Sequence, residues 1–201
     1  MAAAVTQLWA DGLSPDWPVL TGTPVVLMVR TPDTTVRDEA RSLVRTALRS
    51  FLAPWAGCAP DMVPLQIEPG KPPRLALSGV PTGMPVSLSI SHEAGLSLAA
   101  VRLGGSLGVD LMRVADAVLP DWQLLAHDYL GPDAAIRLEG LDLAQRPAAF
   151  ARAWTRHEAA LKCLGLQLQE WSPELAREIG QCRFSELVLP APYCGTVALH
   201  D

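Results

Sequence analysis

Three strand-like segments follow one another between residues 86 and 111, and only short glycine-containing turns separate them. The first, VSLSIS, alternates apolar and small polar residues; LSLAAV follows Gly95, and LGVDL follows Gly104 and Gly105. Strand-like runs joined by glycine turns are typical of hairpins, because glycine adopts the backbone conformations that tight turns require. This part of the chain therefore predicts a three-stranded antiparallel meander.

Two amphipathic helices are predicted, one before and one after these strands in the sequence. In residues 36–51 the apolar residues recur at helical spacing, with Thr34 or Thr35 as the N-cap. The run RPAAFARAWTRHEAALKCLG has Pro147 near its first turn and Gly165 at its end, where helices commonly carry these residues. Each segment should therefore form a helix with one apolar face.

Shorter apolar runs predict further strands at Pro24–Val29, around Val63–Ile67, at Glu186–Leu189 and at Gly195–His200. Helix, loop and strands thus recur in each half of the chain. We expect an α+β protein of two similar-sized lobes, an N-terminal lobe of residues 1–105 and a C-terminal lobe of residues 106–201.

Composition and charge narrow the class of protein. The chain has 201 residues, of which 49% are apolar, so it can bury a substantial core. Its net charge of -5 argues against a general nucleic-acid binder. No apolar run is long enough to span a bilayer, and the N-terminus lacks the basic flank of a secretory signal. No two cysteines have C-x-x-C spacing, and this suits a reduced compartment. The four cysteines are Cys58, Cys163, Cys182 and Cys194. We therefore expect a cytoplasmic protein that binds neither nucleic acid nor membrane.

Polar side chains interrupt two of the strand-like segments. SISHEAG places Ser91, His92 and Glu93 at a strand end, where a ligand could reach them, although a lone histidine is more often structural. Asp110 lies within an otherwise apolar strand. Because desolvating a carboxylate alone is costly, Asp110 needs a partner or a cation, which makes it a stronger signal than a surface aspartate.

The helix predicted at residues 146–165 carries charged residues beside its apolar seam. The seam consists of Phe150, Trp154, His157, Leu161 and Leu164. Glu158 and Lys162 lie one turn apart at the edge of this seam, not on the far side of the helix. Spacing alone leaves two interpretations equally open, a stabilising Glu–Lys pair of about 0.2 to 0.5 kcal/mol or a functional site.

Two further patterns also allow a structural and a functional interpretation. Arginines recur every four residues from Arg37 to Arg49, either as a solvated face or as an anion-binding edge. GGSLG at Gly104–Gly108 fits the G-x-S-x-G nucleophile elbow of the α/β-hydrolases. That motif needs a helix directly after it, whereas a strand-like run follows here, so a hairpin explains the glycines more simply.

Four motifs taken in order carry a family resemblance: GKPPRL, SISHEAG, LGVDLMR and FARAWTRHEAALK. Together they resemble the 4'-phosphopantetheinyl transferases of the surfactin-synthetase-activating type, whose marks are a G-K-P loop, an S-H turn, a G-[IV]-D strand and a W-x-x-K-E-[AS]-x-x-K helix. The resemblance covers residues 36–166. It implies two pseudo-symmetric α/β lobes, each a small antiparallel sheet packed on a long helix, with the active site in the cleft between them.

The resemblance also implies an activity. Such an enzyme transfers 4'-phosphopantetheine from coenzyme A to a serine of an apo acyl or peptidyl carrier protein, releases 3',5'-ADP, requires Mg²⁺ and acts as a monomer. By matching position, Asp110 and Glu158 would hold the metal, and Glu158 would also accept the serine proton. Catalysis should then rest on positioning and charge neutralisation.

Five positions would contact coenzyme A according to the same resemblance. Lys162 and His92 would contact its phosphates, with Ser91 beside His92 in the S-H turn. Arg41 and Lys71 would hold its nucleotide end. His92 and Lys162 would thereby also assist catalysis.

The chain departs from the family pattern at two positions that bear on the metal and the phosphates. Met112 stands where many members have a glutamate, so we expect Glu93 to complete a carboxylate set with Asp110 and Glu158. His157 replaces the first lysine of the helix motif, which would make activity depend on pH if the imidazole must be protonated. These departures also motivate an alternative, a non-catalytic module that binds coenzyme A or a carrier protein.

Overall fold

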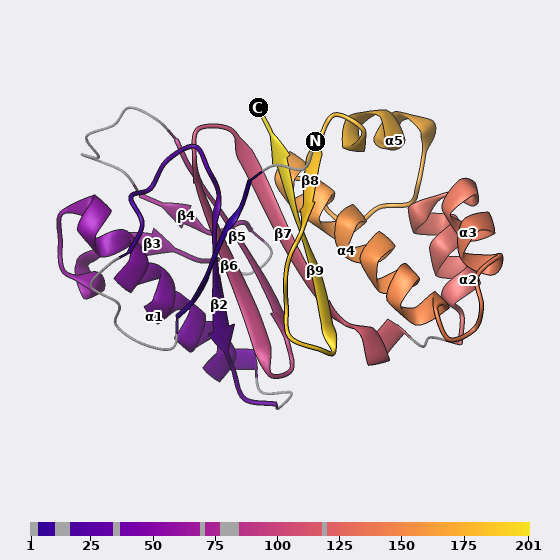
Figure 1. The fold of residues 1–201 in the computed structure, drawn as a ribbon. Helices are drawn as coiled ribbons and strands as arrows, with labels where there is room; N and C mark the ends of the chain where they lie inside the picture. Colours follow the sequence, from indigo (N-terminus) through magenta and orange to yellow (C-terminus); the bar gives the residue numbers. More distant parts are fainter. Residues whose placement is uncertain (1–3, 11–16, 34–36, 69–70, 77–84, 118–119) are drawn as a thin grey trace. The chain divides into compact units, whose positions relative to one another are not determined.

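The computed structural model describes residues 4–10, 17–33, 37–68, 71–76, 85–117 and 120–201 (Figure 1). The chain forms two compact units, one of Ala4–Leu107 with Asp201 and one of Gly108–His200. The expected α+β class is confirmed. The interpretation of the units as two lobes with a catalytic cleft between them stays a prediction.

The first unit is built on a four-stranded sheet in the order β1-β2-β6-β5. Its strands are β1 (Thr6–Trp9), β2 (Val25–Arg30), β5 (Val86–Glu93) and β6 (Leu96–Leu103). β1 runs parallel to β2, and the other pairs are antiparallel. The short strands β3 (Leu65–Gln66) and β4 (Arg74–Leu75) form a separate pair after the 3₁₀ turn Pro60–Met62. The strand expected around Val63–Ile67 is thus confirmed in shortened form.

Helix α1 (Arg37–Ala56) packs its apolar face on this sheet. Val44, Leu48 and Leu52 are fully buried in one core cluster with Leu27 of β2 and Val101 of β6. Helical spacing places these residues on one side of the helix, as the periodicity predicts. Leu43, which the periodicity also assigns to this face, lies 39% exposed. The expected N-cap at Thr34 or Thr35 lies outside the described residues.

The second unit combines a three-stranded sheet with helices. The sheet has the order β7-β9-β8, with β7 at Ser106–Arg113, β8 at Arg183–Glu186 and β9 at Tyr193–His200. Helix α4 (Arg146–Leu164) packs along β9 (Figure 1). The unit also contains three shorter helices, α2 (Trp122–Leu125), α3 (Pro132–Glu139) and α5 (Pro173–Ile179). Two single turns complete it, the π-turn Ala126–Leu130 and the 3₁₀ turn Val114–Ala117. In the described part of the chain, no helix is long and apolar enough to cross a membrane.

Helix α4 has the bounds that the sequence predicts. Pro147 occupies its first turn, and Gly165 ends it in the left-handed conformation, with φ of 70°. The backbone N–H of Gly165 donates to the carbonyl oxygens of Leu161 and Lys162 there. Glycine suits this position because it has no Cβ to oppose a positive φ.

Two strand predictions are wrong in part. β5 and β6 form the expected antiparallel hairpin, but β7 lies beside β9 in the second sheet and is not the third strand of a meander. Gly104 and Gly105 both have positive φ and redirect the chain before β7 begins. The strand expected at Glu186–Leu189 ends at Glu186, where the Arg183–Glu186 segment pairs with β9. Val188 instead lies 84% exposed.

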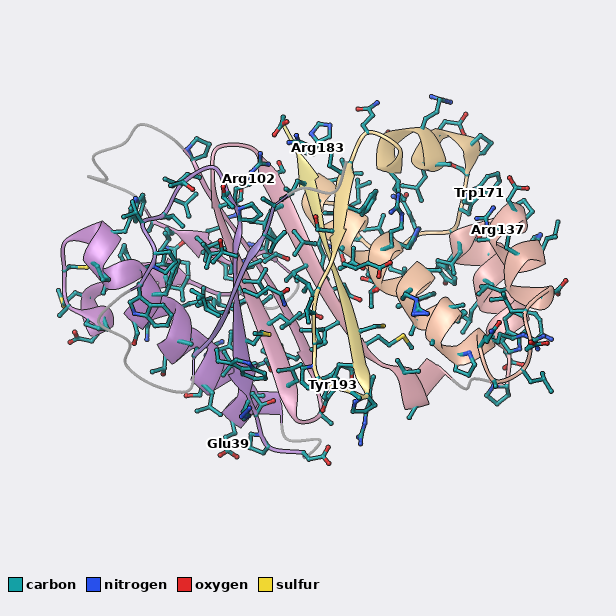
Figure 2. All side chains as sticks on the ribbon, viewed as in Figure 1. Glu39, Arg102, Arg137, Trp171, Arg183 and Tyr193 are labelled. Carbon is teal, nitrogen blue, oxygen red and sulfur yellow. The ribbon has the colours of Figure 1, made fainter. Side chains whose placement is uncertain are left out.

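Hydrogen bonds also hold the C-terminal residue and the segment between α4 and α5. Arg102 is a buried residue of β6 (Figure 2). It donates to the carbonyl oxygen of Gly22, and to the Asp201 carboxylate at 2.5 Å, which ties the C-terminal residue to the first unit. Trp171 lies in the segment between α4 and α5 (Figure 2). Its backbone N–H donates to the carbonyl oxygen of Asp128 at 2.6 Å. This bond joins the segment after α4 to the π-turn.

Candidate functional site

One face of strand β7 lies against helix α4. Alternate residues of a strand share a face, so Gly108, Asp110 and Met112 point to the same side. A Cβ on Gly108 would collide with the carbonyl oxygen of Ala159 and would lie 2.5 Å from the amide nitrogen of Cys163. Only glycine therefore allows the backbone of β7 to approach the helix this closely, and this approach brings Asp110 to the α4 surface.

The Asp110 carboxylate meets the Lys162 ammonium across this contact. Lys162 Nζ lies 2.6 Å from Asp110 Oδ1 and also donates to the carbonyl oxygen of Val109 at 3.2 Å. The Asp110 side chain is 9% exposed and that of Lys162 is 31% exposed. The carboxylate in the apolar strand thus has the charged partner that its burial requires.

Glu158 adds a second carboxylate one helical turn before Lys162. Its side chain is half-buried. Burial raises the pKa of Glu158, the negative charge of Asp110 raises it further, and the positive charge of Lys162 opposes both effects. The two carboxylates and the ammonium are therefore close enough to act on one another electrostatically. The structure brings Asp110, Glu158 and Lys162 together within the second unit.

The Thr155 hydroxyl fixes the helix against the neighbouring strand. Thr155 Oγ1 and Thr196 Oγ1 lie 3.1 Å apart, and both residues are buried. This bond joins α4 to β9 one turn before Glu158. Sequence reasoning missed Thr155, because a threonine in a helix gives no signal of a partner that lies 41 positions further along the chain.

Met112 lies in an apolar environment beside these charges. It packs on a cluster that contains Phe150 and Ala151 of α4 and Ala126 of the π-turn. Trp154 extends the cluster and lies 5.8 Å from both the Phe150 and the Tyr129 rings, measured between ring centroids. A glutamate at position 112 would have to place its charge against this apolar surface, which is unfavourable without a cation. The packing therefore explains a methionine at this position.

His157 is neutral near pH 7. It is 6% exposed, and its buried Nε2 has no hydrogen-bond partner. Burial lowers the pKa of His157 from 6.5 to about 4. The structure thus does not support a protonated imidazole in place of the lysine of the family motif.

The other candidate residues lie in the first unit. Ser91, His92 and Glu93 end strand β5, and His92 Nδ1 is 2.8 Å from the hydroxyl of Ser97 on the paired strand. The exposed Arg41 guanidinium pairs with Asp38 at 3.3 Å. The exposed Lys71 ammonium pairs with Glu68 at 2.6 Å. The expectation that these residues join Asp110, Glu158 and Lys162 in one site stays a prediction.

The hydrolase interpretation of Gly104–Gly108 is wrong. Ser106 begins strand β7, whereas a nucleophile elbow requires a helix directly after the serine. The backbone carbonyl of Ser106 accepts a hydrogen bond from Arg102 at 3.1 Å. The glycines therefore serve a turn between two strands, as the simpler interpretation predicts.

The chemistry of the second unit suits a hard divalent cation. In the part of the chain that the structure describes, no three His, Cys, Asp or Glu side chains gather in an arrangement that could hold a metal ion. Mg²⁺ commonly binds through one or two carboxylates and keeps several waters. Asp110 already forms an ion pair with a positive group, the Lys162 ammonium. The Asp110 and Glu158 carboxylates thus fit such an ion, and the third carboxylate expected from Glu93 stays a prediction.

The close contact at Gly108 leads to a stability prediction. The Gly108→Ala protein should lose about 2 to 3 kcal/mol of unfolding free energy, because the new methyl group must push β7 away from α4. Urea denaturation measures the loss. Gly140→Ala is the matched control, because the nearest atoms to a Cβ there lie 3.7 Å away. Equal stability of the two variants would contradict this account of the contact.

Comparison with known proteins supports the family resemblance. A family model described as "4'-phosphopantetheinyl transferase superfamily" matches residues 106–195, a segment that contains Asp110, Glu158 and Lys162. No curated protein matches the chain. The resemblance is thereby confirmed at the level of the superfamily, and the surfactin-synthetase-activating subtype stays a prediction.

Proposed function

We propose that the protein transfers 4'-phosphopantetheine from coenzyme A to a serine of an apo acyl or peptidyl carrier protein, since residues 106–195 match the model of the 4'-phosphopantetheinyl transferase superfamily. The superfamily match supports phosphopantetheinyl transfer in general. The observation that carries the proposal for this chain is the Lys162 ammonium 2.6 Å from the Asp110 carboxylate, with Glu158 one turn away.

In the proposed reaction, Glu158 accepts the proton of the carrier serine. The serine oxygen forms a bond to the phosphorus that carries pantetheine, and the bond from that phosphorus to the oxygen of the leaving 3',5'-ADP breaks. The raised pKa of Glu158 supports this assignment, because a more basic carboxylate accepts a proton more readily. Such a base must lie within hydrogen-bond reach of the serine, directly or through one water.

Asp110 and Glu158 would hold Mg²⁺ in this proposal. When bound, the ion would neutralise the negative charge of the pyrophosphate. Lys162 would contribute a positive charge to the same phosphates. Glu93, which lies at the end of β5, is proposed as a third oxygen ligand.

The first unit would bind the rest of coenzyme A. We assign Ser91 and His92 to its phosphates and Arg41 and Lys71 to its nucleotide end. Arg41 and Lys71 have largely exposed side chains, so their present partners Asp38 and Glu68 cost little to exchange for a phosphate. We propose a monomeric cytoplasmic enzyme, and the carrier protein is its macromolecular partner.

The direct experiment is intact mass spectrometry of an apo carrier protein. Incubation with this protein, coenzyme A and Mg²⁺ should add one phosphopantetheinyl group to the carrier. The gain should disappear with a chelator, because the charge of the pyrophosphate is then no longer neutralised. A dephospho-coenzyme A arm tests whether the nucleotide end contributes to binding.

A second candidate function makes the opposite prediction. Met112 offers no carboxylate oxygen and His157 is neutral, so this chain lacks two charged groups of the family pattern. A non-catalytic binding module would therefore bind coenzyme A without modifying any carrier. Calorimetric binding of coenzyme A together with an unmodified carrier mass, across carriers of several pathways, would favour this alternative.

A further inference from the structure

The ion pair between Asp110 and Lys162 joins a buried carboxylate to a partly exposed ammonium. The Asp110 side chain is 9% exposed on strand β7, and the Lys162 side chain is 31% exposed on helix α4. The ammonium also bonds the carbonyl oxygen of Val109 at 3.2 Å. The carboxylate is therefore almost entirely buried, whereas the long side chain of Lys162 is partly accessible to solvent.

The ammonium and a divalent cation would compete for the same carboxylate. At 2.6 Å the Lys162 ammonium is in direct contact with Asp110 Oδ1. A metal ion that binds Asp110 would bring a second positive charge next to this ammonium, and like charges at such distances repel strongly in a partly buried site. The two cations thus cannot both contact Asp110 at little cost.

Because Glu158 lies nearby, a divalent cation is a stronger partner for Asp110 than the Lys162 ammonium is. With both carboxylates ionised, Asp110 and Glu158 carry two negative charges near one ammonium. Lys162 neutralises only one of them. A divalent ion shared by both carboxylates would neutralise both, and it would release the lysine to another anion.

We propose that Lys162 is the internal counter-ion of Asp110 in the metal-free protein, and that it leaves Asp110 when a divalent cation binds, so that its ammonium becomes available to the phosphates of coenzyme A. This inference rests on the proposed function for the identity of the metal ligands and of the anion. The ion pair stabilises the site when no metal is bound, because the buried Asp110 carboxylate then keeps Lys162 as its charged partner. It also couples the two ligands: the metal frees Lys162 for coenzyme A, and by linkage coenzyme A strengthens metal binding.

Metal titration without coenzyme A tests the competition directly. The metal-free full chain is titrated with Mn²⁺ alone, and free Mn²⁺ is followed by electron paramagnetic resonance. Lys162→Met keeps most of the apolar side chain and removes the charge, so it should bind Mn²⁺ about 10-fold more tightly than the parent, a coupling of ordinary size. Lys162→Gln, which also lacks the charge but can still donate a hydrogen bond to Asp110, should bind more tightly as well.

The chain offers a matched control for the loss of a paired cation. Arg177 of helix α5 pairs with Glu174 at 3.1 Å. Its side chain is 71% exposed, and that of Glu174 is 68% exposed, so this pair has no buried carboxylate. Arg177→Met should therefore leave the Mn²⁺ affinity unchanged.

The outcomes separate this inference from the proposed function. An unchanged or weaker Mn²⁺ affinity in both Lys162 variants, in a parent that modifies a carrier, overturns the inference alone. Tighter binding in both variants, with a parent that modifies no carrier, supports the inference and removes the proposed transfer. If neither the parent nor the variants bind Mn²⁺, the inference and the metal assignment both fall.

Discussion

The Glu158→Gln protein is expected to transfer phosphopantetheine at least about 100-fold more slowly than the parent, because an amide cannot accept the serine proton. Positioned acid–base groups commonly contribute 10²- to 10⁴-fold, so about 100-fold is the lower end of that range. Glutamine keeps the length of the side chain and its place on helix α4. The change therefore removes the charge and the basic oxygen, and with them the metal ligand that Glu158 would provide.

The environment of Glu158 supports a large effect. Burial, and then the charge of Asp110, raise its pKa, while Lys162 lowers it. A carboxylate with a raised pKa takes up its proton at a higher pH than an ordinary glutamate does. In the parent, the transfer rate should accordingly fall as the pH is lowered through this pKa, and the residual rate of Glu158→Gln should not show that decline.

The matched control is Glu174→Gln on helix α5. Glu174 is an exposed glutamate that pairs with Arg177 at 3.1 Å, and it undergoes the same chemical change outside the candidate site. Initial rates of carrier modification are measured for the three proteins, together with coenzyme A affinity by calorimetry. A Glu158→Gln protein that transfers at the parental rate would exclude Glu158 as the proton acceptor.

Local sequence signals were sufficient for the two long helices, α1 and α4. Apolar spacing, Pro147 and Gly165 together predict α4, and each of them acts over a few residues. The same spacing places Glu158 and Lys162 on one side of the helix, because the helical repeat fixes their angular separation. The sequence could therefore predict which charged groups share an edge of α4.

The pairing of Asp110 with Lys162 could not be predicted in this way. It depends on how strand β7 crosses helix α4, and that contact joins residues 52 positions apart. A glycine within a strand is a known sign of close backbone approach, so Gly108 in LGVDL was a usable signal. The missing side chain of Gly108, and not the motif around it, indicates the contact with α4.

The strand errors have a similar cause. Gly104 and Gly105 have the positive φ of a tight turn. Such a turn suggests that the next strand pairs with the previous one, so the meander was predicted to continue into β7. The position of β7 is decided instead by its contacts with β9 and α4, which are distant in sequence. In β8, Ser185 is buried opposite Val197, whereas the more apolar Val188 is exposed, so hydrophobicity alone favoured the wrong residues.

The second large effect concerns acid stability and comes from His157. In the folded chain burial lowers the pKa of His157 to about 4, compared with an ordinary value of 6.5. Between these two pH values the unfolded chain binds a proton that the folded chain does not. Unfolding is therefore increasingly favoured as the pH falls from 6.5 to 4, and the contribution becomes constant below pH 4. The difference corresponds to about 3 kcal/mol.

The acid sensitivity arises because Nε2 of His157 is buried without a hydrogen-bond partner. No described side chain or backbone group accepts a proton from Nε2, and the ring lies 6.5 Å from the Trp154 ring, between centroids. A protonated imidazole would place a charge there without a partner, which is costly in a buried site. His157→Leu has a similar volume and no titratable group, so it should keep its unfolding free energy over this pH range better than the parent does.

Urea denaturation of the metal-free proteins at several pH values between 4 and 7 measures the effect. The parent should lose about 3 kcal/mol more than His157→Leu over this interval. His127→Leu is the control, because His127 is a histidine with a side chain that is 66% exposed, and its removal should leave the acid sensitivity of the parent in place. If the parent and His157→Leu lose stability in parallel, then His157 has a proton-accepting partner in solution, and the acid sensitivity of the protein comes from its carboxylates instead.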